Sequence, residues 1–186
     1  MRLKSKVQEY KSYKFFVTLG MKRILFFLLI GILFSSCYSF RGVSIPPDVK
    51  TFYVRQVRIN LTGASLAPAD APERFMEELR GKIRSQSRLE WDDTEPHIEF
   101  DCEITSYQVS NEANRQGNEV ALNKLSIGVK ANFYNNNDPE EDWNKSFTFG
   151  IPFDPNEDLQ AVQDGYIADI FEQISENIFN EAFTNW

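Results

Sequence analysis

An unbroken alternation of apolar and polar residues begins at Leu125 and limits what this chain can fold into. Every second residue from Leu125 to Phe133 is apolar, and the residues between them are polar or small. This period of two predicts a β-strand with one face against a core. Three asparagines, an aspartate and Pro139 follow, which is typical of a hairpin turn. A second alternating run over 143–151 predicts the antiparallel partner strand.

Two segments carry the period of an amphipathic helix. The first runs from Pro72 to about Ser85, with an apolar residue every four positions. Asp70 and Glu73 form a capping-box pattern at its start. The second helix is expected from a matching pattern at 154–157, and its period of 3.6 residues continues to the C-terminus. Its apolar stripe is wider than contact with one sheet face requires.

Two further strands are expected, over 49–61 and 97–109. Each changes the parity of its apolar positions part-way, near Arg55 in the first, which indicates a bulge. The expected order is β-α-β-β-β-α. We therefore predict an α+β two-layer sandwich, with two helices packed on one face of a mainly antiparallel four-stranded sheet. Residues 49–186 form this single domain.

Three aromatic residues occupy the distal end of the second helix: Phe179, Phe183 and Trp186. One interpretation is packing in the core along the whole helix. The other is contact with a partner protein at this end. The sequence leaves both open.

The N-terminal region has the pattern of a secretory leader. Lys22 and Arg23 precede an apolar run of eleven residues, which is shorter than the roughly 20 that a membrane-spanning helix needs. Met21 is the expected true start. Residues 1–36 are then an over-extended N-terminus plus a lipoprotein signal peptide, absent from the mature chain.

Cys37 is the first residue after this leader and directly follows Ser35 and Ser36. Small residues before an obligatory cysteine are the signature of the bacterial lipoprotein pathway, which attaches acyl chains to the thiol. A disulfide to the other cysteine, Cys102, would only tie the start of the mature chain to the domain, which is an unusual use of a structural disulfide. Cys102 falls on the apolar parity of a predicted strand, so we expect a buried thiol there. Cys37 is therefore the predicted site of lipidation.

Lipidation at Cys37 sets the expected location of the protein. Two acyl chains already anchor a protein stably in a membrane. Tyr38 follows the cysteine, rather than the aspartate that holds many lipoproteins at the inner membrane. We expect residues 37–48 to be a lipid-anchored tether, and the domain to face the periplasm from the outer membrane.

Removal of the leader reveals an acidic domain. Residues 1–36 carry seven of the 20 basic residues and one of the 27 acidic residues, so the mature chain has 13 basic and 26 acidic residues, a net charge of −13. This charge excludes nucleic acid as a partner.

Catalysis is not expected either. The only histidine, His97, stands beside Pro96 at the start of a strand, and no spacing of histidine, cysteine or carboxylate residues offers a metal site. The acidic pairs lie in turns or at helix starts. We expect neither enzyme activity nor a cofactor.

Five blocks of sequence, in order, together resemble the LptE family of lipopolysaccharide-assembly lipoproteins over residues 37–186. They are CYSFRGVSIPPDVKTFYV, ERFMEELRGKIRSQSRL, IEFDCEITSYQVS, ALNKLSIGVKANFYNNNDPEEDW and FNEAFTNW. The resemblance implies a non-catalytic partner of LptD, the outer-membrane β-barrel that inserts lipopolysaccharide into the outer leaflet. It further implies that the domain plugs the barrel lumen and helps the barrel assemble.

The resemblance also implies contact with lipopolysaccharide through basic residues. The candidates are Arg55, Arg58, Lys124, Lys130 and Lys145. A solvated strand face explains the same residues, and the net charge of the domain opposes an anionic ligand. The alternative function is that of a free-standing outer-membrane lipoprotein that binds a periplasmic or lipid ligand with its sheet face.

Overall fold

The computed structural model describes residues 45–61, 67–112 and 122–184. The chain divides into two compact units, Met1–Gly42 and Val43–Trp186, and the described residues all belong to the second. The predicted leader, Cys37 and Trp186 lie outside the described residues.

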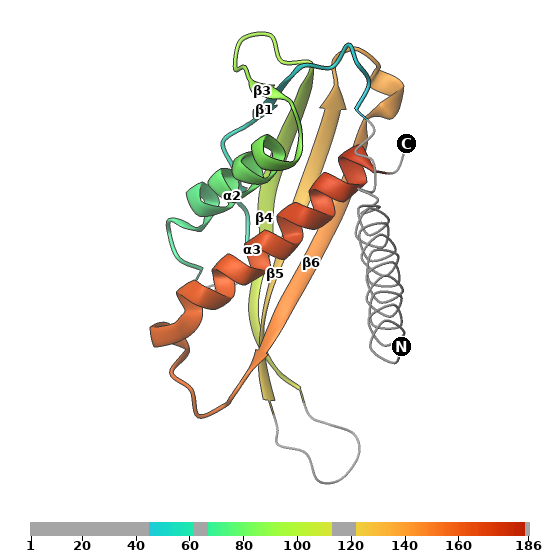
Figure 1. Cartoon of the computed structure of the whole chain (residues 1–186). Helices are drawn as coiled ribbons and strands as arrows, with labels where there is room; N and C mark the ends of the chain where they lie inside the picture. The colour runs from blue at the N-terminus through green and yellow to red at the C-terminus, as the bar shows by residue number, and fades with distance from the viewer. Residues whose placement is uncertain (1–44, 62–66, 113–121, 185–186) are drawn as a thin grey trace, which may run out of the picture. The chain divides into compact units, whose positions relative to one another are not determined.

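The described part of the chain folds into two layers, a sheet and a pair of helices (Figure 1). The strands are β1 (Thr51–Val54), β2 (Arg58–Ile59), β3 (Glu90–Trp91), β4 (Ile98–Glu112), β5 (Leu122–Asn135) and β6 (Trp143–Phe153). The helices are α2 (Ala71–Gln86), α3 (Leu159–Phe183) and the 3-10 helix η1 (Pro139–Glu141). Both long helices lie on the same face of the sheet, as predicted, and α3 crosses it diagonally (Figure 1).

The sheet is mixed rather than the predicted four-stranded, mainly antiparallel one. Its strand order is β3-β1-β4-β5-β6, and β2 pairs with β4 beside β1. β4, β5 and β6 form two long antiparallel ladders. β1 and β2 run parallel to β4, and β3 runs parallel to β1. The cause is α2, which lies between β2 and β4 in the chain and serves as the crossover that parallel strands need.

Both predicted changes of parity correspond to irregularities in the strands. The register of β4 against β5 shifts between Ile104 and Ser106. The first predicted strand divides into β1 and β2, and the amide of Arg55 in the break donates to the carbonyl of Phe100. Each irregularity moves the apolar positions that follow it to the other parity.

The helix starts differ from the sequence prediction in detail. α2 begins within one residue of the expected position, but the Asp70 side chain makes no capping hydrogen bond. α3 begins at Leu159, later than predicted, with the Asp158 carboxylate accepting from the amide of Gln160. The predicted start at Asp154 is instead a turn, which the Asp154 carbonyl closes.

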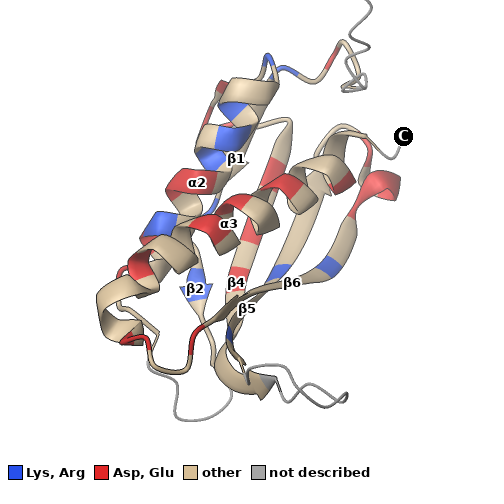
Figure 2. Ribbon diagram, turned by 60° about the horizontal axis from the view of Figure 1, so that its bottom comes forward, with Lys and Arg blue, Asp and Glu red and all other residues tan. Residues whose placement is uncertain are grey.

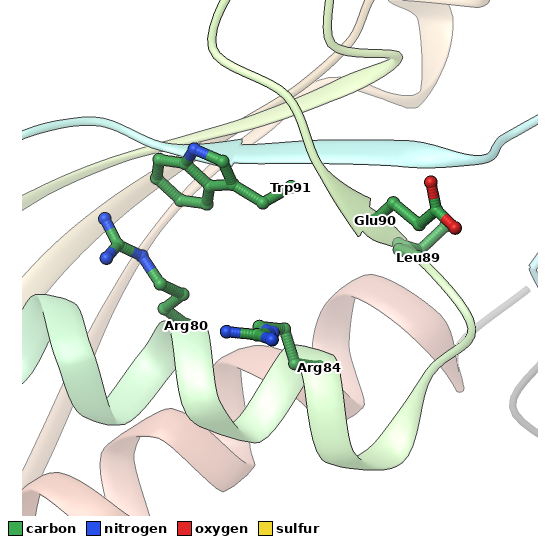
Figure 3. Close-up of a pocket in the computed structure, with 5 residues that line it drawn as sticks. All are labelled: Arg80, Arg84, Leu89, Glu90 and Trp91. Atoms are coloured by element: carbon green, nitrogen blue, oxygen red, sulfur yellow. The ribbon is translucent and has the colours of Figure 1, made fainter.

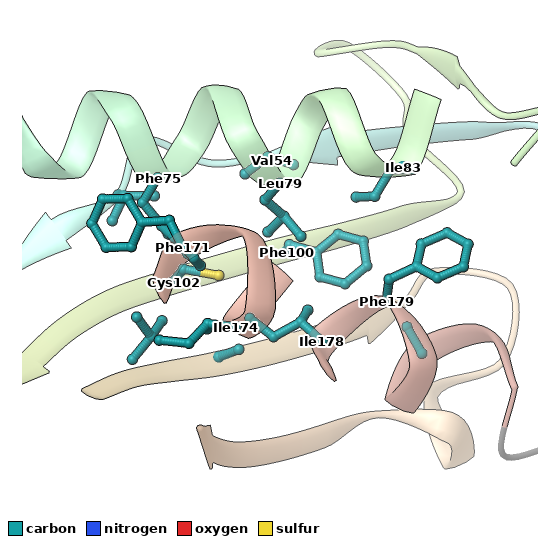
Figure 4. Close-up of a cluster of buried hydrophobic side chains, with 14 of the residues drawn as sticks. Val54, Phe75, Leu79, Ile83, Phe100, Cys102, Phe171, Ile174, Ile178 and Phe179 are labelled. Atoms are coloured by element: carbon teal, nitrogen blue, oxygen red, sulfur yellow. The ribbon is translucent and has the colours of Figure 1, made fainter. Parts of the chain in front are cut away.

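The core fills the space between the sheet and the two helices (Figure 4). Phe75, Leu79 and Ile83 point down from α2 and are fully buried, as their spacing of four residues predicts. The ring of Phe75 packs edge-on against Phe171 of α3 at 5.1 Å between centroids. The sheet contributes Phe100 and its neighbours on the same parity.

Ion pairs and hydrogen bonds join the two helices outside this core. The Lys82 ammonium lies 3.0 Å from the Glu176 carboxylate, and Gln86 donates to the same carboxylate. Burial alone would raise the pKa of Glu176, but these hydrogen bonds outweigh it and lower the pKa below its usual value. At the other end of α2, Arg74 donates to the side chain and carbonyl of Asp164.

Two glycines occupy opposite packing environments. A Cβ added at Gly81, on the exposed side of α2, would meet no atom within 4 Å. Close packing therefore does not explain this glycine. A Cβ at Gly150 in β6 would lie 2.9 Å from the carbonyl oxygen of Leu125 and 2.4 Å from the Ser126 hydroxyl.

These environments predict opposite effects of the same substitution. Gly81→Ala should stabilise the domain by up to about 1 kcal/mol, because alanine loses less backbone entropy in a helix. Gly150→Ala should destabilise it by about 1–3 kcal/mol, because the methyl group overlaps backbone. Urea unfolding of the detergent-solubilised chain, followed by circular dichroism, measures both. Equal effects of the two substitutions on the free energy of unfolding would contradict the difference in packing at Gly81 and Gly150.

A polar sheet face as the candidate functional site

The sheet face opposite the helices is polar, and no described element covers it. β5 directs every second side chain to this face, and the apolar residues between them are buried under the helices. The residues of β5 on this open face are Leu122, Lys124, Ser126, Gly128, Lys130, Asn132 and Tyr134. The candidate site therefore rests on the same alternation that builds the core.

Arg55 lies at the β1 side of the open face and is held by its neighbours. Its guanidinium lies 2.6 Å from the Glu99 carboxylate and 5.5 Å from the ring centroid of Tyr134. The hydrogen bond to Glu99 raises the pKa of Arg55 above its ordinary value. Its positive charge is thus already matched by a carboxylate of β4.

Arg58 is engaged in the same way. Its guanidinium lies 3.0 Å from the Asp101 carboxylate, whose side chain is only 11% exposed. In the register, Arg58 stands beside Glu103, which stands beside Lys130 of β5. Basic and acidic residues therefore alternate across the strands, a favourable cross-strand arrangement.

Lys124 and Lys130 lie on the open face, as their shared parity predicts. Lys130 forms no ion pair with another described residue, and its cross-strand neighbours are Glu103 and Ser146. Small residues separate the two lysines along β5 and β6. The Cε of Lys124 comes within 2.9 Å of a Cβ placed on Gly150, so the lysine stem lies across that glycine. The result is a flat polar strip with a lysine at each end.

Lys145 does not belong to this face. It is paired with Ala131, whose side chain is buried under the helices, and its ammonium contacts the Glu181 carboxylate of α3. The five basic residues therefore do not share one face, because the parity of Lys145 in β6 places it on the helix side. Figure 2 shows the acidic residues that recur along α3 on that side.

Phe179 and Phe183 lie in the core and offer a partner no surface. Each is 1% exposed. Their rings pack together at 4.9 Å between centroids, and Phe183 meets Phe100 of the sheet at 6.2 Å. The wide apolar stripe of α3 is used in full because the helix contacts both the sheet and α2. These two positions therefore fit the interpretation of packing in the core, whereas Trp186 lies outside the described residues.

Cys102 is a buried thiol, as predicted. Its side chain is 0% exposed, and burial raises the pKa of the thiol to about 12. A thiol of this kind is inert toward metals and oxidants at neutral pH. Among the described residues, no three histidine, cysteine or carboxylate side chains gather as a metal site, and no helix is long and apolar enough to cross a membrane.

The family model LptE, described as lipopolysaccharide-assembly, matches residues 50–182. The chain belongs to the LptE family. Its members are non-catalytic lipoproteins that act in lipopolysaccharide assembly and partner with LptD. An LptE-type role in lipopolysaccharide assembly, within the cell envelope, follows for this protein. Among curated protein sequences, none matches this chain.

Solved structures with a similar fold come from several bacteria. A hypothetical protein from Chlamydia trachomatis superimposes with a TM-score of 0.52 over 73% of this chain and 99% of its own, at 11% identity. A minor lipoprotein from Acinetobacter baumannii gives a TM-score of 0.44 over 67% of this chain and 89% of its own, at 7% identity. The chlamydial likeness shows a shared fold alone.

The ion pairs of the open face predict different roles for two of its cations. Arg58→Gln should lower the free energy of unfolding by about 1 kcal/mol, because it leaves the Asp101 carboxylate without its partner. Lys130→Gln, the matched control, should change it by less than about 0.5 kcal/mol. Urea unfolding of both variants at one ionic strength measures this difference. A loss for Lys130→Gln as large as for Arg58→Gln would show that the pairing is not specific.

Proposed function

We propose that this LptE-family protein is anchored in the outer membrane by a lipid on Cys37 and fills the lumen of an LptD-type barrel, which it helps to assemble. The observation that carries the proposal is the open face of the sheet. A sheet face that no described element covers contacts either solvent or a partner. The chemistry of its residues indicates which kind of partner fits.

The chemistry of the open face fits the wall of a barrel lumen. The inner wall of an outer-membrane barrel is polar, because apolar residues face the lipid. The strip between Lys124 and Lys130 presents hydroxyl and amide groups, and the paired charges of Arg55 and Arg58 lie next to it on the β1 and β2 side. Such groups form hydrogen bonds with a polar wall, and flatness allows close approach. The helix side is also polar outside the core, so the whole domain suits a wet lumen.

The end of the domain that meets the tether fits the same arrangement. Asn137, beside η1, donates to the Asp48 carboxylate, and Ile45 is 7% exposed. The tether therefore joins the domain at the end that carries η1. Ile45 is the eighth residue after Cys37, a reach of at most about 29 Å. A lipid on Cys37 would keep this end near the membrane, and the β4–β5 hairpin would point away from it.

Co-purification from detergent-solubilised membranes tests the proposal. The tagged protein should be recovered with a large β-barrel in a one-to-one ratio. Recovery of the tagged protein alone, with barrel assembly normal in its absence, would refute the plug. A free-standing lipoprotein predicts that second result. In the same preparation, a Cys37→Ser chain should no longer incorporate palmitate, and continued acylation would refute the anchor.

A pair of bulky substitutions distinguishes the two sides of the domain in that experiment. Thr148 is exposed in β6, on the open face beside Gly128, and Glu172 is exposed on α3. Thr148→Trp should lower barrel recovery at least fivefold, because the ring disrupts a flat contact. Glu172→Trp should lower it less than twofold. A similar loss from both substitutions would mean that the open face has no special part in the contact.

We further propose that Lys124 and Lys130 form the part of the open face that contacts lipopolysaccharide. Both lysines lie on the open face, and Lys130 forms no ion pair with another described residue. Arg55 and Arg58 are held by acids of β4, and Lys145 lies on the helix side. A photocrosslinker at Ser126, between the two lysines, should label lipopolysaccharide. Lys124→Glu with Lys130→Glu should lower labelling at least fivefold, because the phosphates then meet negative charge. Lys145→Glu is the control on the other face, and unchanged labelling in the double variant would refute this contact.

A further inference from the structure

A hollow of about 450 Å³ lies at the edge of the sheet, where the C-terminal half of α2 faces β3 (Figure 3). Arg80 and Arg84 line it from α2, and Leu89, Glu90 and Trp91 line it from the strand side. This volume is within the range of roughly 300–1,000 Å³ for small-molecule sites. The charge of the lining is unusual for this chain, because two arginines meet in a domain whose net charge is strongly negative.

Arg80 is held in place with donors to spare. Its Cζ lies 3.9 Å from the centroid of the Trp91 ring, a cation–π contact. One terminal nitrogen donates to the Glu77 carboxylate at 2.8 Å. The Nε is buried and has no hydrogen-bond partner among the described residues. Of the five N–H donors of this guanidinium, the contact with Glu77 uses one, and the group is held in a fixed position.

Arg84 adds a second guanidinium one helical turn further on. It has no ion-pair or hydrogen-bond partner among the described residues. Figure 3 shows both guanidinium groups on the Trp91 side of α2, whereas the Glu90 carboxylate points away from them. Like charges at this spacing repel. The dipole of α2 favours a cation in its last turn, but it does not account for a second cation fixed against Trp91.

We propose that this hollow binds a small organic phosphate, with Arg80 and Arg84 on the phosphate and Trp91 beside the organic part. Two guanidiniums with unused donors match a dianion with three terminal oxygens, whereas one carboxylate is saturated by one arginine. The anion also relieves the repulsion between the two arginines. Because Arg80 is already fixed by Trp91 and Glu77, its ordering costs little on binding.

This inference goes beyond the proposed function and is independent of it. The hollow uses none of the residues of the open face, and neither the anchor nor the barrel takes part. A chain that failed to plug a barrel would keep the site, and a chain without the site would keep its open face. The two proposals can therefore fail separately.

Isothermal titration of the full chain in a non-ionic detergent, at constant ionic strength and without phosphate buffer, tests the site. Glucose 6-phosphate is the probe for an organic phosphate, and inorganic phosphate, glucose and glucuronate are the comparisons. Glucose 6-phosphate should bind saturably at one site per chain, and glucose should not bind. Equal binding of inorganic phosphate would identify free phosphate as the ligand. Equal binding of glucuronate would overturn the phosphate assignment.

Substitution of neighbouring arginines locates the site. Arg84→Gln should weaken glucose 6-phosphate binding at least tenfold, with the unfolding midpoint little changed because Arg84 is exposed. Arg88 is exposed in the loop after α2 and does not line the hollow, so Arg88→Gln should weaken binding less than twofold. Arg80→Lys keeps the positive charge but loses the paired N–H donors of the guanidinium, and should weaken binding at least fivefold. Equal losses for Arg84→Gln and Arg88→Gln, or no saturable binding, would overturn the proposal.

Discussion

The antiparallel ladder between β4 and β5 is the interaction on which the rest of the structure depends. It runs from Ile98 paired with Asn135 to Glu112 paired with Leu122, and only one register shift interrupts it. Because side chains alternate between the faces of a strand, this one register decides which residues meet the helices and which meet a partner. A slip by one residue would bury Lys130 and expose Val129. The core and the candidate site are thus two faces of one pairing.

The same dependence explains which parts of the fold could be predicted. Alternation is a local signal, so the run from Leu125 to Phe133 was enough to predict a strand and both of its faces. The stripe of α2 is local too. β3 is only two residues long, and no periodicity can appear over that length. The pairing of β3 with β1, and the parallel direction of that pairing, depend on tertiary contacts. Trp91 lines the hollow, and its place in a strand could therefore not be predicted from the sequence.

The face on which a residue lies could not be predicted where it depended on more than the residue's own strand or helix. Lys145 is a basic residue of an antiparallel strand, like Lys130, but the pairing of Lys145 with Ala131 places it on the helix side, in contact with Glu181 of α3. Phe183 lies at the end of a stripe too wide for one sheet face, yet α3 packs on the sheet and on α2 together. In both cases the missing information is the path of α3 across the sheet. A helical wheel gives the width of a stripe but not the number of its neighbours.

The two proposed sites differ in whether their arginines have acidic partners among the described residues. On the open face, Arg55 and Arg58 are paired with acids, so that face is polar with little net charge to desolvate. A large partner surface gains from such a face because buried charges remain compensated. At the hollow, Arg84 has no partner among the described residues, and Arg80 keeps unused donors. A small anion gains from that arrangement because it supplies the missing charge. α2 and β3 place the hollow at the sheet edge farthest from β6, so a ligand there leaves the strip on β5 and β6 open, and both sites can be occupied at once.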